Sequence, residues 1–248
     1  DKSLPRDIES ANIWKELFKQ KGIEAKIVDL GSEEDAANKG MQGGRIFSYY
    51  AKNWWSRAGK PESMPAGEPG GPCSEMFYEF DTIEHDPKFG RFCHPNCDCG
   101  RYLEIGNSVF MEYIKDKEGN FNKLPRRNVD FGGGLERIVA VSQNISDIFK
   151  IDTIYPLITL LEDKSGSRYS DLKYTASFRV VSDHIRSAVF LIADDVMPSN
   201  TDRGYFVRRL IRRAVRHADI IGLKNQGLEG LVDYVVQAYK DTYPNIFE

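Results

Sequence analysis

Cysteine and histidine are scarce in this sequence, with four residues of each among 248. No apolar run approaches the roughly 20 residues that a membrane-spanning helix needs, so the sequence excludes a membrane protein of that kind. The residues at the start of the sequence show no signal-peptide pattern, so a signal peptide is not expected either. The cysteines are clustered instead of spread along the chain, which argues against a disulfide framework. A reducing, cytoplasmic setting is therefore expected.

Two common nucleotide-binding motifs are also absent. The glycine-rich segment that follows Asn128 has neither the spacing of the dinucleotide fingerprint nor the Gly-Lys-Ser/Thr ending of a phosphate loop. The segment reads Asn-Val-Asp-Phe-Gly-Gly-Gly-Leu-Glu-Arg-Ile and predicts a strand, a turn and a helix. Its glycines allow the backbone to approach a flat or charged ligand. The competing interpretation is a flexible turn before a helix.

Three residue types in this segment have chemistry that suits an activated nucleotide. Asp130 follows β-forming residues and can hold an ammonium group at the mouth of a sheet. Gly132 and Gly134 lie in the glycine run, and Arg137 falls in the first helical turn. A guanidinium there presents a planar fork to phosphate oxygens or a flat surface to adenine. The sequence therefore predicts a nucleotide site.

The pattern of elements predicts an α+β fold with two domains and a boundary near residue 150. A helix is expected at 7–21 and a strand at 23–30, whereas residues 32–44 are polar without strong periodicity. Strands are expected at 73–81, 102–115 and 128–131, with a hairpin turn at 117–120. Only helices are expected beyond the boundary, at 151–162, 175–195, 204–221 and 228–242. The strands are expected to form an antiparallel set flanked by helices.

Two positions in the first half are further candidates for binding a small molecule. Trp55 follows another tryptophan, so one of the pair can line a cleft while the other packs inward; two core aromatics are an equally good interpretation. Asn107 shares a strand face with apolar residues and must find polar partners there. These partners are a substrate ammonium or carboxylate, or a backbone group.

A cysteine-rich segment suggests a structural zinc ion. Cys93, His94, Cys97 and Cys99 lie within seven residues, and Cys73 lies upstream. Three cysteines with Cys73 or His94 as the fourth ligand would suit zinc. The spacing matches no standard zinc ribbon, so free thiols are the alternative.

The formal net charge is only −3, but its distribution points to a nucleic acid. Between Arg203 and His217 the chain has six arginines and no acidic residue. Arg209, Arg212, Arg213 and Arg216 recur at helical spacing opposite an apolar stripe. Such a stripe can bind phosphates, whereas a solvated surface normally mixes both signs. In the loop before it, Asn200 could contact base edges in a shallow RNA minor groove.

At this point the chain resembles the alanyl-tRNA synthetases, a family of class II aminoacyl-tRNA synthetases. The matching segments extend from about Trp55 to His217 and are long and ordered. They are Gly-Pro-Cys-Ser-Glu at 71–75, Arg-Tyr-Leu-Glu-Ile at 101–105 with Asn107 and Val-Phe-Met at 109–111, Val-Asp-Phe-Gly-Gly-Gly-Leu-Glu-Arg at 129–137, Ser-Asp-His-Ile-Arg-Ser at 182–187, the segment Leu191 to Tyr205, and the run of arginines at 208–217.

The resemblance implies activation of alanine by ATP with Mg²⁺ and transfer of alanine to the 3′ end of its tRNA. It assigns Trp55, Asn107 and Asp130 to alanine. Gly132, Gly134 and Arg137 match class II motif 3, at 128–138, which contacts ATP. Residues 1–150 then correspond to the later part of the aminoacylation domain, and 151–248 to a helical domain that reads the tRNA acceptor stem. In that domain the resemblance assigns Asn200, Arg203, Arg209, Arg212 and Arg213 to tRNA.

The sequence also departs from the family. Class II motifs 1 and 2, the editing domain and the C-terminal region are not found, and Pro-Gly-Gly at 69–71 replaces a cysteine-bearing repeat. The chain is therefore expected to be a fragment. A non-catalytic tRNA-binding fragment, and half of a split enzyme whose upstream chain carries motifs 1 and 2, are the alternatives to an active synthetase.

Overall fold

The computed structural model describes residues 4, 6–50, 52–223 and 227–247. The chain divides into two compact units, residues 1–146 (unit 1) and 147–248 (unit 2). Unit 1 combines helices with two sheets, and the regular elements described in unit 2 are helical. The expected α+β class is confirmed. The functional assignments of residues 1–150 and 151–248 stay predictions.

Unit 1 begins with a small α/β segment. Helix α1 (Ile8–Gln20) starts at Asp7, whose side chain accepts a hydrogen bond from the Ser10 amide. Strands β1 (Ile27–Gly31) and β2 (Ile46–Tyr49) pair in parallel. The polar stretch in which no periodicity was expected contains α2 (Glu33–Lys39), which begins at a capping box of Ser32 and Asp35. The helix is only seven residues long, so its cap identifies it better than its periodicity does.

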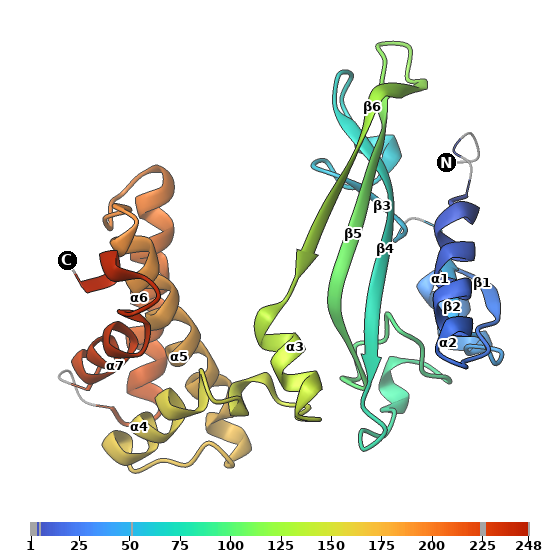
Figure 1. Ribbon diagram of the computed structural model, residues 1–248. Helices are drawn as coiled ribbons and strands as arrows, with labels where there is room; N and C mark the ends of the chain where they lie inside the picture. Colours follow the sequence, from blue (N-terminus) through green and yellow to red (C-terminus); the bar gives the residue numbers. More distant parts are fainter. Residues whose placement is uncertain (1–3, 5, 51, 224–226, 248) are drawn as a thin grey trace. The chain divides into compact units, whose positions relative to one another are not determined.

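The main sheet of unit 1 is antiparallel and has four strands in the order β3-β4-β5-β6. They are β3 (Trp54–Ser56), β4 (Pro69–Glu79), β5 (Tyr102–Lys115) and β6 (Phe121–Gly133). A tight turn joins β5 to β6 where the hairpin was expected, and β6 starts earlier than the predicted strand at 128–131. Figure 1 shows α3 (Leu135–Ser142) following directly on β6, so the glycine run joins strand to helix.

Long connections join β3 to β4 and β4 to β5. They contain the short 3-10 helices Pro61–Ser63 and Pro87–Phe89, respectively. The β4–β5 connection carries Cys93, Cys97 and Cys99. Because the connection leads directly into β5, the start of that strand depends on how the connection is held.

Unit 2 is a helical bundle. After the 3-10 helix Ile148–Lys150 come α4 (Tyr155–Ser165), α5 (Leu172–Ala193), α6 (Asp202–Ile220), α7 (Glu229–Tyr239) and the 3-10 helix Pro244–Phe247. Its core includes Leu161, Phe178, Ala214 and Leu231, one from each α-helix and each fully buried. Among the described residues, no helix is both long and apolar enough to cross a membrane.

Candidate functional site

Three of the residues predicted to bind small molecules lie on one face of the antiparallel sheet. Glu75 on β4 is directly opposite Asn107 on β5, which is opposite Gly132 on β6. In the next row along the same face, Val109 is flanked by Cys73 and Asp130. Directly opposed residues share a face, and residues two apart on one strand do so as well. The register therefore gathers Asn107, Asp130 and Gly132.

The side-chain oxygen of Asn107 is the clearest sign of a missing ligand on this face. It is buried and has no hydrogen-bond partner within the described part of the chain. A buried carbonyl oxygen without a donor costs free energy comparable to a lost hydrogen bond. An ammonium group can supply this donor, and the Asp130 carboxylate one row away is an exposed counter-charge.

Two glutamates that the sequence interpretation did not select add negative charge to the same site. Burial raises the pKa of Glu75, and the nearby carboxylate of Glu104 raises it further. Burial, with smaller contributions from both glutamates, raises the pKa of Cys73 to about 12. Cys73 is therefore a neutral thiol here, and the site favours a cationic group. The available signal was the position of Glu75 two residues after Cys73, in the segment that resembles the synthetases.

The glycine run leaves open space beside this face. A Cβ added to Gly132 would meet nothing within 4 Å, and Gly132 is exposed. The Gly134 amide donates to the Ile105 carbonyl at 3.1 Å, which fixes the turn against β5. The run can thus admit a flat ligand close to the backbone without rearrangement.

Arg137 is held at the edge of the site by β5. Its Nη1 donates to the main-chain oxygen of Glu104 at 2.8 Å and lies 3.4 Å from the Glu104 carboxylate. Its side chain remains 45% exposed, so the guanidinium has further donors for a ligand. The predicted phosphate or adenine contact is compatible with this arrangement and stays a prediction.

The two adjacent tryptophans have different surroundings. Trp54 packs edge-on against Phe121 and lies near Tyr113, at centroid distances of 5.5 and 6.1 Å. Trp55 lies on edge strand β3, opposite Gly71, and is 38% exposed. Trp55 is thus the tryptophan with a free surface, as a pocket residue requires, but its contact with alanine stays a prediction.

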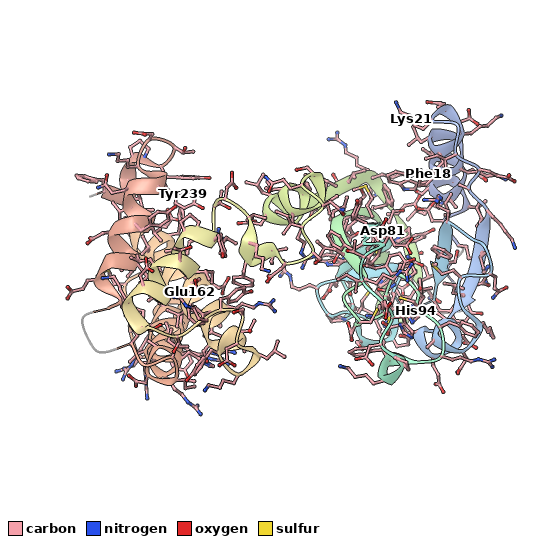
Figure 2. All side chains as sticks on the ribbon, turned by 90° about the horizontal axis from the view of Figure 1, so that it is seen from below. Phe18, Lys21, Asp81, His94, Glu162 and Tyr239 are labelled. Atoms are coloured by element: carbon pink, nitrogen blue, oxygen red, sulfur yellow. The ribbon has the colours of Figure 1, made fainter. Side chains whose placement is uncertain are left out.

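The cysteine-rich segment forms a cluster with a different fourth member from those expected. The ligand atoms of His85, Cys93, Cys97 and Cys99 all lie within 4.8 Å of one another. Cys73 and His94 do not belong to this cluster, which corrects the choice of fourth ligand. The Cys73 thiol instead donates to the Lys52 carbonyl at 3.3 Å. His94, labelled in Figure 2, is buried and its Nδ1 lies 3.0 Å from the Tyr49 hydroxyl.

The basic stripe lies on the exposed side of α6. Val207, Ala214 and Ala218 face the core. All arginines of the helix are exposed, and none forms an ion pair with another described residue: Arg203, Arg208, Arg209, Arg212, Arg213 and Arg216. Exposed Tyr205 and Phe206 lie on the same helix. Guanidinium groups without an ion-pair partner among the described residues, interleaved with aromatic rings, suit a nucleic acid.

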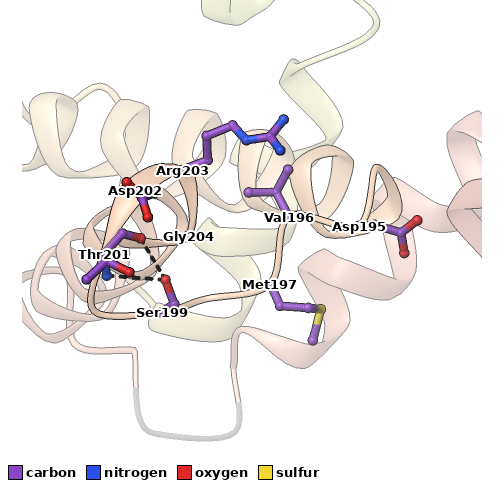
Figure 3. A pocket seen from close by; sticks show the side chains of 8 residues that line it. All are labelled: Asp195, Val196, Met197, Ser199, Thr201, Asp202, Arg203 and Gly204. Carbon is purple, nitrogen blue, oxygen red and sulfur yellow. Dashed lines mark hydrogen bonds between the residues drawn. The ribbon is translucent and has the colours of Figure 1, made fainter.

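The loop that precedes α6 is tightly built. Its Ser199 amide donates to the Gly204 carbonyl at 3.0 Å, and the Ser199 hydroxyl donates to the Thr201 carbonyl at 2.7 Å. The loop lines a pocket of about 200 Å³. Figure 3 shows Arg203 among the side chains that surround it. Asn200 is exposed and accepts a hydrogen bond from Arg208. A ligand of Asn200 would therefore compete with Arg208.

Comparison with known proteins identifies the family. The family model "tRNA synthetases class II (A)" matches residues 5–248. Curated relatives named alanine–tRNA ligase include proteins from Clostridioides difficile, 42% identical over 73% of this chain and 20% of its own length, and from Petrotoga mobilis, 38% identical over 98% of this chain and 25% of its own. The protein of that name from Borrelia hermsii is 36% identical over 100% of this chain and 37% of its own.

The chain thus spans between 20% and 37% of the length of these three relatives. The matched residues include the whole antiparallel sheet, the glycine run and the basic helix. The fold and the match therefore lead to one conclusion: the chain belongs to the class II (A) family of tRNA synthetases.

Proposed function

We propose that this chain takes part in the activation of alanine by ATP and in the transfer of alanine to the 3′ end of alanine tRNA. The observation that carries the proposal is the unpaired, buried oxygen of Asn107 beside Asp130, at the end of a glycine run that leads to Arg137. The name of the relatives, alanine–tRNA ligase, supports alanine as the amino acid.

The alanine ammonium group would lie between Asn107 and Asp130. The Asn107 oxygen accepts one hydrogen bond from it, and the Asp130 carboxylate neutralises its charge. Trp55 would limit the space for the side chain, so that alanine fits and larger amino acids are excluded by bulk. The negative charge of Glu75 and Glu104 reinforces the selection of a cation.

ATP would bind along the glycine run. Gly132 and Gly134 allow close approach of the nucleotide, and Arg137 contacts phosphate or adenine. Mg²⁺ bound with ATP supplies neutralisation of the phosphate charge. A carboxylate oxygen of alanine attacks the α-phosphorus, pyrophosphate leaves, and alanyl-adenylate forms. This chemistry depends on placement and charge neutralisation more than on a strong base.

The second step would use unit 2. We propose that Arg203, Arg209, Arg212 and Arg213 contact the acceptor stem and that Asn200 reads a base pair after release from Arg208. A ribose hydroxyl of the terminal adenosine then attacks the carbonyl carbon of the adenylate, and AMP leaves. Residues 1–150 are accordingly assigned to activation and 151–248 to recognition of the stem.

Two further predictions concern the surroundings of the protein. A cytoplasmic setting is expected from the clustered cysteines. An upstream chain carrying motifs 1 and 2 is the partner expected if the protein is half of a split enzyme. The zinc ion that the cysteine-rich segment predicts is proposed independently of this reaction.

The test is alanine-dependent exchange of pyrophosphate into ATP, with the chain alone and with a second chain that carries motifs 1 and 2. Exchange that requires Arg137, in either arm, would support the proposal, and the arm in which it occurs separates a self-sufficient site from a split enzyme. Tight tRNA binding with no exchange in either arm and no binding of alanine or ATP would replace it with the non-catalytic alternative.

A further inference from the structure

Two distances within the cluster of His85, Cys93, Cys97 and Cys99, whose ligand atoms all lie within 4.8 Å of one another, match the edges of a tetrahedral zinc site. The sulfurs of Cys93 and Cys99 are 3.5 Å apart, and Cys97 Sγ lies 3.7 Å from His85 Nδ1. With Zn–S near 2.3 Å and Zn–N near 2.0 Å, a tetrahedron has S···S and S···N edges of about 3.8 and about 3.5 Å. Both distances are close to these edges.

A second observation concerns the outward side of the His85 ring. Its Nε2 lies 2.9 Å from the Gly90 carbonyl oxygen, which can only accept a hydrogen bond. The Nε2 proton is thereby fixed, and in the neutral ring Nδ1 carries a lone pair directed at the three sulfurs. A histidine that binds a metal almost always donates its other N–H to a carbonyl or carboxylate in this way. The cluster thus has four ligand atoms and also the hydrogen bond to the Gly90 carbonyl that orients the histidine ligand.

The donor set selects the type of metal. Three thiolates and one imidazole are a common structural zinc set, and soft sulfur ligands disfavour magnesium and calcium. A disulfide between Cys93 and Cys99 would need an S–S distance near 2.05 Å, well below the observed 3.5 Å. Such a disulfide would also not explain why Cys97 lies 3.7 Å from His85 Nδ1.

The connection that carries these ligands has little else to hold it. Between Phe80 and Arg101, the only regular element is the 3-10 helix Pro87–Phe89. The connection is anchored to the small α/β segment by the Phe92 amide, which donates to the Ala37 carbonyl at 2.9 Å, and by His94 against Tyr49. An ion would tie its two halves together, because His85 precedes this anchor and Cys97 and Cys99 follow it.

We infer that His85, Cys93, Cys97 and Cys99 form a structural zinc site that closes the β4–β5 connection and fixes the start of β5. Cys99 lies three residues before Tyr102, the first residue of that strand. At this end of the sheet, Gly106 pairs with Gly133 of the glycine run. The ion thus stabilises the strand that carries Asn107 without contacting a substrate.

The experiment measures zinc in the full chain, purified under reducing conditions, by native mass spectrometry and elemental analysis. We expect about one zinc ion per chain. Cys97→Ser and His85→Ala should each lose at least tenfold in zinc affinity, measured by competition with a chromophoric chelator. Cys73→Ser is the matched control, because Cys73 is buried in the same unit but lies outside the cluster, and it should keep the wild-type affinity.

Cobalt substitution provides a readout that does not depend on the folding of a variant. Co²⁺ bound to the wild-type chain should give the intense absorption of a tetrahedral site, together with thiolate-to-cobalt charge transfer. Removal of zinc should increase hydrogen exchange in the β4–β5 connection more than in α1. A wild-type chain in which Cys93, Cys97 and Cys99 react as free thiols and which has no affinity for zinc would overturn the inference, as would unchanged zinc affinity in His85→Ala.

Discussion

Arg137 donates a hydrogen bond from Nη1 to the main-chain oxygen of Glu104 at 2.8 Å, across the junction between α3 and β5. This contact holds a guanidinium group at the end of the glycine run before any ligand arrives. A side chain that is already positioned loses less conformational entropy on binding. The relationship makes Arg137 the first residue to vary.

Replacement of Arg137 should weaken ATP binding, and the loss should be larger when both the charge and the planar guanidinium group are removed. For Arg137→Ala we expect a loss of roughly 10- to 100-fold, the range of a hydrogen bond to a charged group. Arg137→Lys keeps the charge without the planar guanidinium group, so its ATP affinity should lie between those of the wild type and Arg137→Ala. Calorimetric titration with ATP·Mg²⁺ measures the effect, and Arg168→Ala in unit 2 is the control. Equal affinities of wild type and Arg137→Ala would reject the assignment.

Asp130 should matter for alanine far more than for ATP. Asp130→Asn removes the charge that we propose faces the ammonium group, and the expected loss of alanine affinity is about tenfold or more. The ATP affinity should change by less than about twofold. Titrations with each ligand provide the comparison, and Asp163→Asn, an exposed change in α4, controls for net charge. Equal losses for both ligands would contradict the role.

Substitution by alanine should have different effects on stability at two glycines of the sheet. A Cβ on Gly132 meets nothing within 4 Å, whereas a Cβ on Gly71 would lie 1.7 Å from the Phe110 carbonyl oxygen. We expect Gly132→Ala to change the free energy of unfolding by less than about 0.5 kcal/mol and yet to weaken ATP binding. Gly71→Ala should cost about 1–3 kcal/mol or more.

Tryptophan fluorescence during urea unfolding can follow both glycine variants in unit 1, because all three tryptophans, Trp14, Trp54 and Trp55, lie there. An unstable Gly132→Ala variant would mean that this glycine serves the fold and not a ligand. An ATP affinity equal to that of the wild type would remove it from the nucleotide site.

The raised pKa of Glu75 predicts a pH dependence of stability in unit 1. Burial and the charge of Glu104 raise the pKa of Glu75 in the folded state, so the folded chain binds this proton more tightly than the unfolded chain. The stability that Glu75 contributes to the folded chain is fully present below the pKa that Glu75 has in the unfolded chain. It is lost as pH rises through the pKa that Glu75 has in the folded chain. Glu75→Gln should therefore stabilise unit 1 at neutral pH and flatten this part of the profile.

Urea unfolding detected by tryptophan fluorescence between pH 4 and pH 8 measures this effect for Glu75→Gln and for the wild type. Glu118→Gln, in the β5–β6 turn, is the control. The pH range starts near the ordinary glutamate pKa of about 4.3 and extends above it, because the pKa of Glu75 is raised. A Glu75→Gln profile parallel to that of the wild type would show that Glu75 titrates alike in the folded and unfolded chains.

The arginines of α6 should contribute to tRNA binding mainly through phosphates. If Arg212 and Arg213 each meet a phosphate, Arg212→Gln with Arg213→Gln should reduce the slope of log affinity against log salt by about 1–2. Lys173→Gln, an exposed change in α5, should leave the slope unchanged. Binding measured by fluorescence anisotropy between low and moderate salt tests this. An unchanged slope in the double variant would place the tRNA elsewhere.

The register of the sheet explains why the sequence revealed only part of the site. Asn107 and Asp130 could be selected by type and context. Glu75 lies in a segment that resembles the synthetases, but nothing in the sequence placed Glu75 and Glu104 beside each other. Their proximity depends on the pairing of β4 with β5, which contains a register shift between Met76 and Phe77. Such irregularities move a residue relative to its neighbours and have no reliable sequence signature.

The sequence by itself determined the α+β class, the family, the glycine run and the basic stripe of α6, because these depend on local periodicity and on residues close together in the chain. Only the tertiary structure decided which histidine joins the three cysteines and which carboxylates surround Asn107. His94 is adjacent to Cys93, but the fold directs its ring toward Tyr49, whereas His85, eight residues earlier, turns toward the sulfurs. Proximity in space follows from how the β4–β5 connection folds back on itself, and spacing along the chain does not contain that information.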